Sequence, residues 1–364
     1  MLTVPAARSD PASRAQIAAA SVEALFGGRS LGLPGTRLAA VASPHPVGLR
    51  GHWHYWWQAH YLDCLIDQHE RLAGKDPGEA AVVLRRAHRL ARGIWVRNGL
   101  RWTNSYYDDM AWLALALQRL EAASASAGRR RRSGDAGLRE ALRSASTGHL
   151  GGGVFWNTTR DYKNTATTAP AALYFARSGE PERAADLMTW LRKTLRDHDT
   201  GLYLDGVRLR TGPGIDPGDS ELVRAVHTYN QGTVLGALVT LGGEDLLTEA
   251  AHLIGAIASG LANTEGVLTM DSGGDAGLFT GILARYLALA VRTPGLPGDA
   301  ARTAVGLLQA TADSLWTRRS PGNAPHSLVF PPGSNGQGSR PVSLSTQLQA
   351  WMVLEAAARV QRPR

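Results

Sequence analysis

The sequence is poor in cysteine and lysine. Cys64 is the single cysteine, so no disulfide can form within the chain, and we expect this thiol to be a small buried group. Only Lys75, Lys163 and Lys193 are lysines, and the net charge of +8 therefore comes from arginine. Part of it lies in Arg129–Arg132, within a stretch of small residues typical of an exposed loop. No aromatic residues alternate with these arginines, as binding to single strands requires, so we expect no nucleic-acid partner.

Long hydrophobic runs are also missing. No stretch reaches about 18 consecutive apolar residues, so we expect no membrane-spanning helix. The opening MLTVPAARSDPASRAQIAAAS has no apolar segment between a basic start and a cleavage site. On this pattern we expect a cytoplasmic protein, or a secreted one if a leader has been removed. The chain has 364 residues, 44% of them hydrophobic, which is consistent with one large repetitive domain over residues 1–364.

Sequence motifs for metals and nucleotides are absent as well. The chain has no HExxH, CxxC, EF-hand or P-loop pattern and no G-x-S-x-G nucleophile elbow. His52 and His54 in GHWH are potential zinc ligands, but no carboxylate or cysteine partner is evident near them in the sequence. We therefore expect no metal ion and no nucleotide chemistry.

Alternating strand patterns are scarce, whereas alanine and leucine recur at helical spacing almost everywhere. This periodicity predicts about twelve helices. They cover residues 11–26, 53–72, 77–97, 106–123, 135–147, 164–178, 181–196, 227–242, 245–262, 276–292, 298–318 and 342–360.

Every second predicted helix begins with a polar, aromatic or glycine-rich segment, such as HWHYWWQAH or SYYDDMAW. The helices between them have the charged outer faces of amphipathic surface helices. The alternation repeats every ~45–70 residues and predicts an all-α (α/α)6 toroid, with six helical hairpins arranged as inner and outer rings. A linear helical solenoid is the alternative. In a toroid the polar segments would gather at one end of the inner ring and form a cleft.

Two adjacent aspartates, Asp108 and Asp109, stand in the first turn of one predicted inner helix. Backbone N–H groups and the helix dipole stabilise negative charge there, so helix capping alone would explain them. Alternatively, they are the nucleophile and the acid/base of a retaining glycosidase, whose carboxyl groups lie ~5–5.5 Å apart. Mutual repulsion would raise the pKa of one, so that a protonated acid and an ionised nucleophile coexist.

Side chains suited to sugar hydroxyls stand near the starts of other inner helices. Asn and Gln amides both donate and accept hydrogen bonds, as vicinal hydroxyls do. Each candidate could instead be a helix cap or a turn residue. Their equivalent positions in successive repeats favour binding. The candidates are Lys163, Asn164, Asp205, Tyr229, Asn230, Gln231 and Asp275.

Several motifs, in the same order along the chain, resemble glycoside hydrolase family 76, the endo-α-1,6-mannanases with an (α/α)6 toroid. They span residues 50–290, and adjacent aspartates are the signature of the family. The motifs are YWWQAHYLDCLID, YYDDMAWLALAL, YKNTATTAPAALYFAR, GLYLDGV, YNQGTVLGALVTL and GGDAGLFTGILARYLA.

The resemblance implies retaining hydrolysis of an α-1,6-mannan backbone, with Asp108 as nucleophile, Asp109 as acid/base and no cofactor. Its substrate would be α-mannan or a manno-oligosaccharide, and we expect a monomer. Further residues would form the substrate-binding cleft. They are Tyr107, Trp112, Trp56, Lys163, Asn164, Asp205, Tyr229, Asn230, Gln231 and Asp275.

Two features depart from the family. Its members are typically secreted or surface-bound, whereas this sequence shows no leader. The chain after residue 295, including the loop PPGSNGQGSRP that begins at Pro331, carries no family motif.

Three other functions remain open. A transglycosylase of the same family would use the same aspartates with a sugar acceptor in place of water. A mannan-binding protein without turnover would keep the cleft but lack a working acid/base, and the intact aspartate pair argues against it. A sugar epimerase on the same fold would need paired histidine bases, and His227 has no evident partner.

Overall fold

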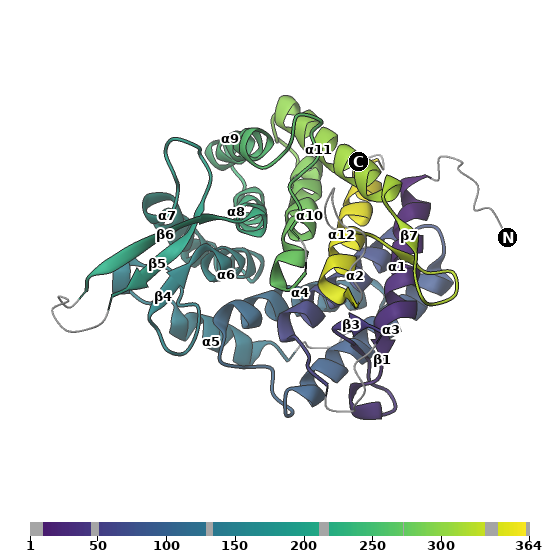
Figure 1. Cartoon of the computed structure of the whole chain (residues 1–364). Helices are drawn as coiled ribbons and strands as arrows, with labels where there is room; N and C mark the ends of the chain where they lie inside the picture. The colour runs from purple at the N-terminus through teal and green to yellow at the C-terminus, as the bar shows by residue number, and fades with distance from the viewer. Residues whose placement is uncertain are drawn as a thin grey trace.

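The structure is a computed structural model, described for residues 10–44, 51–128, 134–210, 218–271, 273–331 and 341–361. Arg129–Arg132 and residues 332–340 of the PPGSNGQGSRP loop lie outside these ranges. Twelve α-helices occupy the described residues (Figure 1). They are α1 (Pro11–Phe26), α2 (Tyr55–Leu72), α3 (Pro77–Arg97), α4 (Tyr107–Ser126), α5 (Ala136–Ala145), α6 (Thr165–Arg177), α7 (Pro181–Thr194), α8 (Thr228–Leu241), α9 (Glu244–Gly260), α10 (Phe279–Arg292), α11 (Gly298–Thr317) and α12 (Leu344–Val360).

The even-numbered helices form a closed inner ring. Each packs against the next, from α2 through α4, α6, α8 and α10 to α12, and α12 packs back against α2. The odd-numbered helices lie outside this ring (Figure 1). The arrangement confirms the predicted (α/α)6 toroid and excludes the linear solenoid, because a solenoid leaves its first and last helices apart.

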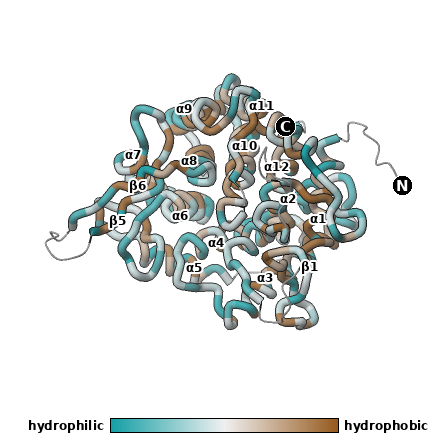
Figure 2. The backbone as a smooth tube through the Cα atoms, viewed as in Figure 1, coloured by the Kyte–Doolittle hydropathy of each residue, from teal (hydrophilic) through white to brown (hydrophobic). Residues whose placement is uncertain are grey.

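The pattern of hydrophobic residues explains which helices form the inner ring. In α8 every residue from Asn230 to Val239 is buried, as expected for a helix covered on all sides. In α5, by contrast, the buried residues are Leu138, Leu142 and Ala145, which recur three and four positions apart on one face. Figure 2 shows hydrophobic residues running through the inner helices.

Glycines let neighbouring inner helices approach closely. A Cβ atom added to Gly232 of α8 would lie 2.7 Å from the Cα of Leu283 in α10. One added to Gly281 of α10 would lie 2.7 Å from the Cα of Gln349 in α12. The close contacts between α8, α10 and α12 therefore require the absence of a side chain at these positions.

Short antiparallel strands, which the sequence does not predict, lie in the segments between the helices. The largest sheet has the order β4 (Tyr162–Asn164), β5 (Leu204–Leu209) and β6 (Ser220–Val226). β4 runs directly into α6, and β6 ends one residue before α8, so the sheet positions the starts of two inner helices. The two-stranded pairs are β1 (Gly27–Gly28) with β2 (Leu38–Ala39), β3 (Ala42–Ser43) with β9 (Val342–Ser343), and β7 (Ser320–Pro321) with β8 (Leu328–Val329).

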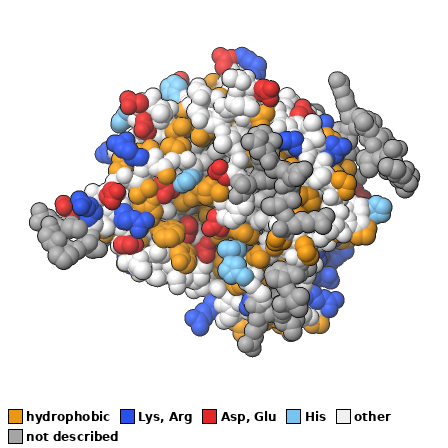
Figure 3. All heavy atoms as spheres, viewed as in Figure 1, with side chains coloured by type: hydrophobic (Ala, Val, Ile, Leu, Met, Phe, Trp, Pro, Cys, Tyr) orange, Lys and Arg blue, Asp and Glu red, His pale blue; other side chains and the backbone are white. Residues whose placement is uncertain are grey.

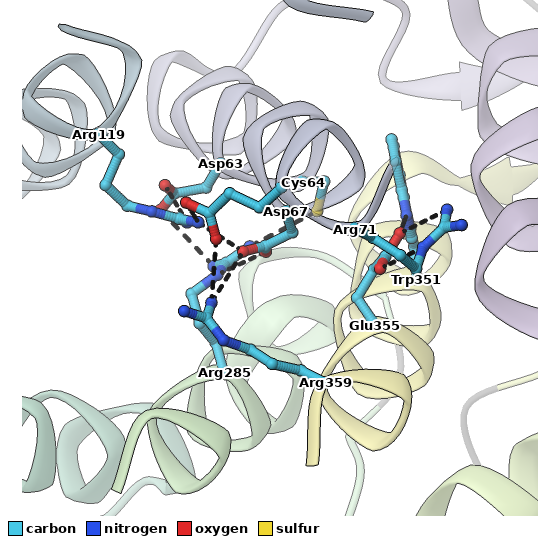
Figure 4. A network of polar contacts seen from close by, with 10 residues as sticks. Asp63, Cys64, Asp67, Arg71, Arg119, Arg285, Trp351, Glu355 and Arg359 are labelled. Carbon is cyan, nitrogen blue, oxygen red and sulfur yellow. Dashed lines mark hydrogen bonds and ion pairs between the residues drawn. The ribbon is translucent and has the colours of Figure 1, made fainter. Parts of the chain in front are cut away.

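Charged side chains fill the ring toward the C-terminal ends of the inner helices (Figure 4). Arg119 of α4 pairs with Asp63 at 2.8 Å and with Asp67 at 2.6 Å, both on α2. Arg285 of α10 pairs with Asp67 at 2.9 Å. Burial alone would raise the pKa of Asp67, but the guanidinium groups of Arg119 and Arg285 outweigh it and lower the pKa to about 2. Cys64 beside them is fully buried, as predicted.

A second part of this network joins the two ends of the ring. Arg71 of α2 forms a two-point ion pair with Glu355 of α12, with nitrogen–oxygen distances of 2.8 and 3.1 Å. The indole of Trp351 donates to the same carboxylate at 3.1 Å (Figure 4). No helix in the described ranges is long and apolar enough to cross a membrane.

Candidate active site

The N-terminal ends of the inner helices meet on one face of the toroid. Asp108 and Asp109 lie in the first turn of α4, and Trp56 lies in the first turn of α2. Asp275 begins the short helix η3 (Asp275–Leu278), which leads into α10. The Trp56 indole donates to Asp275 at 3.0 Å, so residues far apart in the sequence share one site. Figure 3 shows acidic side chains and histidines among hydrophobic ones near the middle of this face.

Asp108 accepts a hydrogen bond on each carboxyl oxygen. Its Oδ1 accepts from the backbone N–H of Asp109 at 2.9 Å, and its Oδ2 accepts from the indole N–H of Trp156 at 2.9 Å. Burial raises the pKa of Asp108 to about 7, although both donors favour the ionised form and oppose this rise.

Asp109 has a weaker set of donors. Its Oδ2 accepts from the side-chain N–H of Asn104 at 2.6 Å, and the amide oxygen of Asn104 accepts from the backbone N–H of Tyr106 at 2.9 Å. Burial first, and then the charge of Asp108, raise the pKa of Asp109 well above its ordinary value.

The two carboxyl groups are therefore suited to different protonation states. Asp108, with a donor on both oxygens, is the one that ionises first, and Asp109 retains its proton. One ionised and one protonated carboxyl group are what a nucleophile and a general acid require. The separation of ~5–5.5 Å between them stays a prediction.

Asp275 lies between two tryptophans of α2. The indoles of Trp56 and Trp57 both donate to its Oδ1, at 3.0 and 2.8 Å. Its charge also contributes to the raised pKa of both Asp108 and Asp109, so all three carboxyl groups share one electrostatic environment. The carboxyl group of the exposed Asp275 is available to sugar hydroxyls.

Asp205 of β5 stands on another wall. Its Oδ2 accepts from the phenol of Tyr162 at 2.5 Å, and its Oδ1 accepts from the amide of Asn230 at 3.2 Å. The imidazole of His227 lies 3.9 Å from Oδ1. Asn230 itself is fully buried, so it holds Asp205 in place, while Asp205 remains partly exposed.

Aromatic rings line the site between these carboxyl groups. Tyr229 stacks on Phe279 with ring centroids 4.1 Å apart. Burial raises the pKa of Tyr229, and the charges of Asp205 and Asp108 raise it further. Trp112 is 3% exposed and packs against Tyr229, with centroids 6.3 Å apart, so it supports this surface from below.

Three predicted sugar ligands make structural contacts instead, and their side chains are at most 4% exposed. Lys163 donates to backbone oxygens of the loop before β4, including that of Gly152 at 2.6 Å. Asn164 caps α6 by accepting from the backbone of Thr167. Gln231 bonds both the N–H and the C=O of Tyr203 at 2.8 Å. These geometries correct the prediction of direct sugar binding, because the polar groups already have protein partners.

Tyr107 is also less accessible than predicted. It is 6% exposed and begins α4, and its backbone N–H donates to the carbonyl of Trp156 at 2.7 Å. Its neighbour Tyr106 is 43% exposed and packs edge-on against Trp156 with centroids 5.3 Å apart. The exposed aromatic surface beside the aspartates is therefore Tyr106, which was not predicted.

Sequence reasoning missed Asn104, Trp156, Tyr162 and Phe279. Asn104 stands only four residues before Asp108, and Trp156 follows the glycine run GGG at 151–153. The glycines signal a tight loop, which is a frequent carrier of functional residues, but nothing in the sequence pairs that loop with α4.

The histidine pair does not form a complete metal site. The Nε2 atoms of His52 and His54 lie 3.0 Å apart, and His54 stacks on Trp57. In the part of the chain that the structure describes, no three His, Cys, Asp or Glu side chains are grouped to hold a metal ion.

The comparisons with known proteins agree on one family. The sequence profile described as Glycosyl hydrolase family 76 matches residues 13–363. No curated protein sequence matches the chain significantly.

Several solved structures are similar to this chain. An α-1,6-mannanase from a Salegentibacter species is 28% identical, with a TM-score of 0.82 over 97% of this chain and 100% of that one. An inactive variant of that mannanase, with two consecutive aspartates replaced by asparagine, is 27% identical at the same TM-score and coverage, and is in complex with α-1,6-mannotriose. A family 76 mannosidase from Bacteroides thetaiotaomicron is 17% identical, with a TM-score of 0.74 over 97% of this chain and 98% of that one, which shows the fold alone.

Proposed function

Because the chain belongs to glycosyl hydrolase family 76 and is a glycoside hydrolase acting on mannosidic bonds, we propose that it cleaves α-1,6-mannan backbones internally and with retention of configuration. The observation that carries this proposal is the unequal hydrogen bonding of Asp108 and Asp109. The inactive mannanase variant, altered at two consecutive aspartates and bound to α-1,6-mannotriose, supports the same pair and the same linkage.

In the proposed reaction the ionised Asp108 attacks the anomeric carbon while Asp109 donates its proton to the leaving glycosidic oxygen. The bond from Asp108 to the sugar replaces the glycosidic bond. Asp109, now ionised, then removes a proton from water, whose oxygen displaces Asp108 from the sugar. Asp109 has its proton back at the end of the cycle, and the sugar has been inverted twice.

Substrate binding is proposed for the groups that remain accessible. Asp275 and Asp205 would accept hydrogen bonds from sugar hydroxyls, since each is already fixed by protein donors. Tyr106 and the stacked pair of Tyr229 and Phe279 would contact the apolar faces of the sugar rings.

The test is a proton NMR time course on linear α-1,6-manno-oligosaccharides. We expect α-anomeric products first, together with internal cleavage of the longer oligomers. Asp108→Asn and Asp109→Asn should each lower kcat by a factor of about 100 to 10,000. Asp186→Asn, on the exposed face of α7, is the matched control and should leave kcat unchanged.

The outcomes separate the alternatives. β-Anomeric first products would contradict retention, and full activity of Asp109→Asn would contradict its role as acid/base. Products longer than the starting oligomer would indicate a transglycosylase. Binding without turnover by the unmodified protein would indicate a mannan-binding protein.

A further inference from the structure

Among the residues that the structure describes, Trp156 is the one whose side chain donates a hydrogen bond to the carboxylate of Asp108. The indole N–H lies 2.9 Å from Asp108 Oδ2. An indole nitrogen can only donate a hydrogen bond, so the oxygen that faces it must accept. This contact therefore favours a carboxyl oxygen without a proton.

The second oxygen of Asp108 is constrained in the same way. Its Oδ1 faces the backbone N–H of Asp109 at 2.9 Å, which also can only donate. A protonated Asp108 would have to turn its hydroxyl away from one of these donors. The two donors together fix the plane of the carboxylate and favour its charge, yet leave each oxygen a lone pair for attack on the sugar.

The indole is held firmly in this position. The backbone of Trp156 donates to the carbonyl of Tyr162 at 2.8 Å and accepts from the N–H of Tyr107 at 2.7 Å. Its ring packs against Tyr106 and Tyr162, with centroids 5.3 and 6.2 Å away. Trp156 is thus tied both to the start of α4, which carries Asp108, and to β4.

The loop before Trp156 has its own anchor in Lys163. The buried ammonium group donates to the carbonyls of Thr147, His149 and Gly152 at 2.8, 2.8 and 2.6 Å. It also lies 4.6 Å from the ring centre of Phe155, the residue next to Trp156. A lysine in this place holds the turn that presents the indole to Asp108.

We propose that Trp156 is a positioning residue for catalysis, which orients the nucleophilic carboxylate of Asp108 and favours its ionised form in the free enzyme. This inference rests on the proposed function. It gives Lys163 an indirect part, as the anchor of the loop that carries Trp156.

The test compares two tryptophan variants by their pH profiles of kcat/KM on α-1,6-manno-oligosaccharides. Trp156→Phe keeps an aromatic ring but removes the donor, so the acidic limb should move upward by about one pH unit. On that limb kcat/KM should fall about tenfold or more at a given pH. Trp351→Phe is the matched control. The indole of Trp351 also donates to a carboxylate, that of Glu355, but it lies away from Asp108, toward the opposite end of the inner helices. This variant should lower the melting temperature and leave the pH profile in place.

A second substitution removes the donor with less change of shape. 3-Benzothienylalanine at position 156 replaces the N–H by sulfur and keeps the bicyclic ring, and it should reproduce the shift of Trp156→Phe. An unchanged acidic limb in this variant, or an equal shift in Trp351→Phe, would overturn the inference. The Asp108→Asn variant distinguishes a failure of this inference from a failure of the proposed function. If Asp108→Asn is inactive while the acidic limb of the Trp156 variants stays in place, only the role of Trp156 fails. If Asp108→Asn is active, the proposed function fails.

Discussion

At the scale of single residues, the site gives two chemically identical aspartate side chains different hydrogen-bond donors and different acidity. Asp108 and Asp109 share a helix turn and a common electrostatic environment, but their hydrogen-bond donors differ in number. Burial raises the pKa of both, and the extra donor keeps Asp108 the more acidic of the two. The proposed roles in catalysis thus depend on Trp156 and Asn104 as well as on the aspartates.

The raised pKa values carry a cost in stability. Below the ordinary aspartate pKa of 3.8 both groups are protonated in the folded and unfolded chain. As the pH rises from there through about 7, the unfolded chain loses its protons first, so the free energy of unfolding falls.

Asp109→Asn removes part of this cost, because an amide does not titrate. We expect the variant to be inactive but more stable by roughly 1–3 kcal/mol at pH 8, with a gain that shrinks toward pH 4. Thermal melts of both proteins across this range check it. A variant less stable than the parent protein at pH 8 would contradict the argument.

The sequence predicts the residues of the site unevenly. Asp108, Asp109, Trp56, Tyr229 and Asp275 stand at inner-helix starts and do converge, because the fold brings these starts together. Helix starts also carry capping and anchoring residues of the same types, so the sequence pattern does not distinguish Asn164 and Gln231 from sugar ligands. Trp156 lies in a loop with no helical period, and its contact with Asp108 spans 48 positions.

At the scale of elements, the inner ring depends on close helix packing at glycine. In α8, Gly232 meets the backbone of α10. On the outer ring, Gly306 of α11 has open space around its Cα. Substitutions to alanine at these two positions therefore separate the effect of close packing from the effect of helix propensity.

We expect Gly232→Ala to destabilise the fold by about 1–3 kcal/mol, because the added methyl group overlaps the Leu283 backbone. Gly306→Ala should stabilise it by about 0.5–1 kcal/mol, since alanine favours the helix and meets nothing. Urea unfolding of both variants measures the difference. Equal effects of the two substitutions would show that packing at Gly232 is not limiting.

The helices could be predicted from sequence, whereas the strands could not. Each of the twelve predicted segments overlaps one observed helix, because apolar period and capping residues are local signals. Most of the strands have two or three residues, and β3 pairs with the distant β9, Ala42 with Ser343. Two-residue strands offer no alternation to detect, and the pairing of β3 with β9 exists only after the two ends of the ring have met.

At the scale of the whole molecule, ion pairs fasten the ring where its ends meet. Arg71 of α2 and Glu355 of α12 are about equally buried, at 6% and 5% side-chain exposure. Arg359 of α12 reinforces the same junction by pairing with Glu70 of α2 at 3.3 Å. Removing one member of a buried pair leaves the other charge without its counter-charge.

Arg71→Met should therefore cost about 3–5 kcal/mol of unfolding free energy, measured by denaturant unfolding. The double variant Arg71→Met with Glu355→Leu should regain much of this loss, because neither charge remains. Arg302→Ala, which breaks an exposed pair with Asp299, is the control and should change stability little. A double variant as unstable as the single one would contradict this account.

The packing of α1 and α2 against α12 also determines when the fold can be completed during synthesis. Because α12 follows α1 and α2 in the chain and packs on both, their apolar faces stay open until the chain beyond residue 344 has left the ribosome. The turn of α4 that carries Asp108 and Asp109 emerges earlier, but the ring around it closes only after α12 has been made. A chaperone that shields α1 and α2 during this interval would protect the nascent enzyme from aggregation.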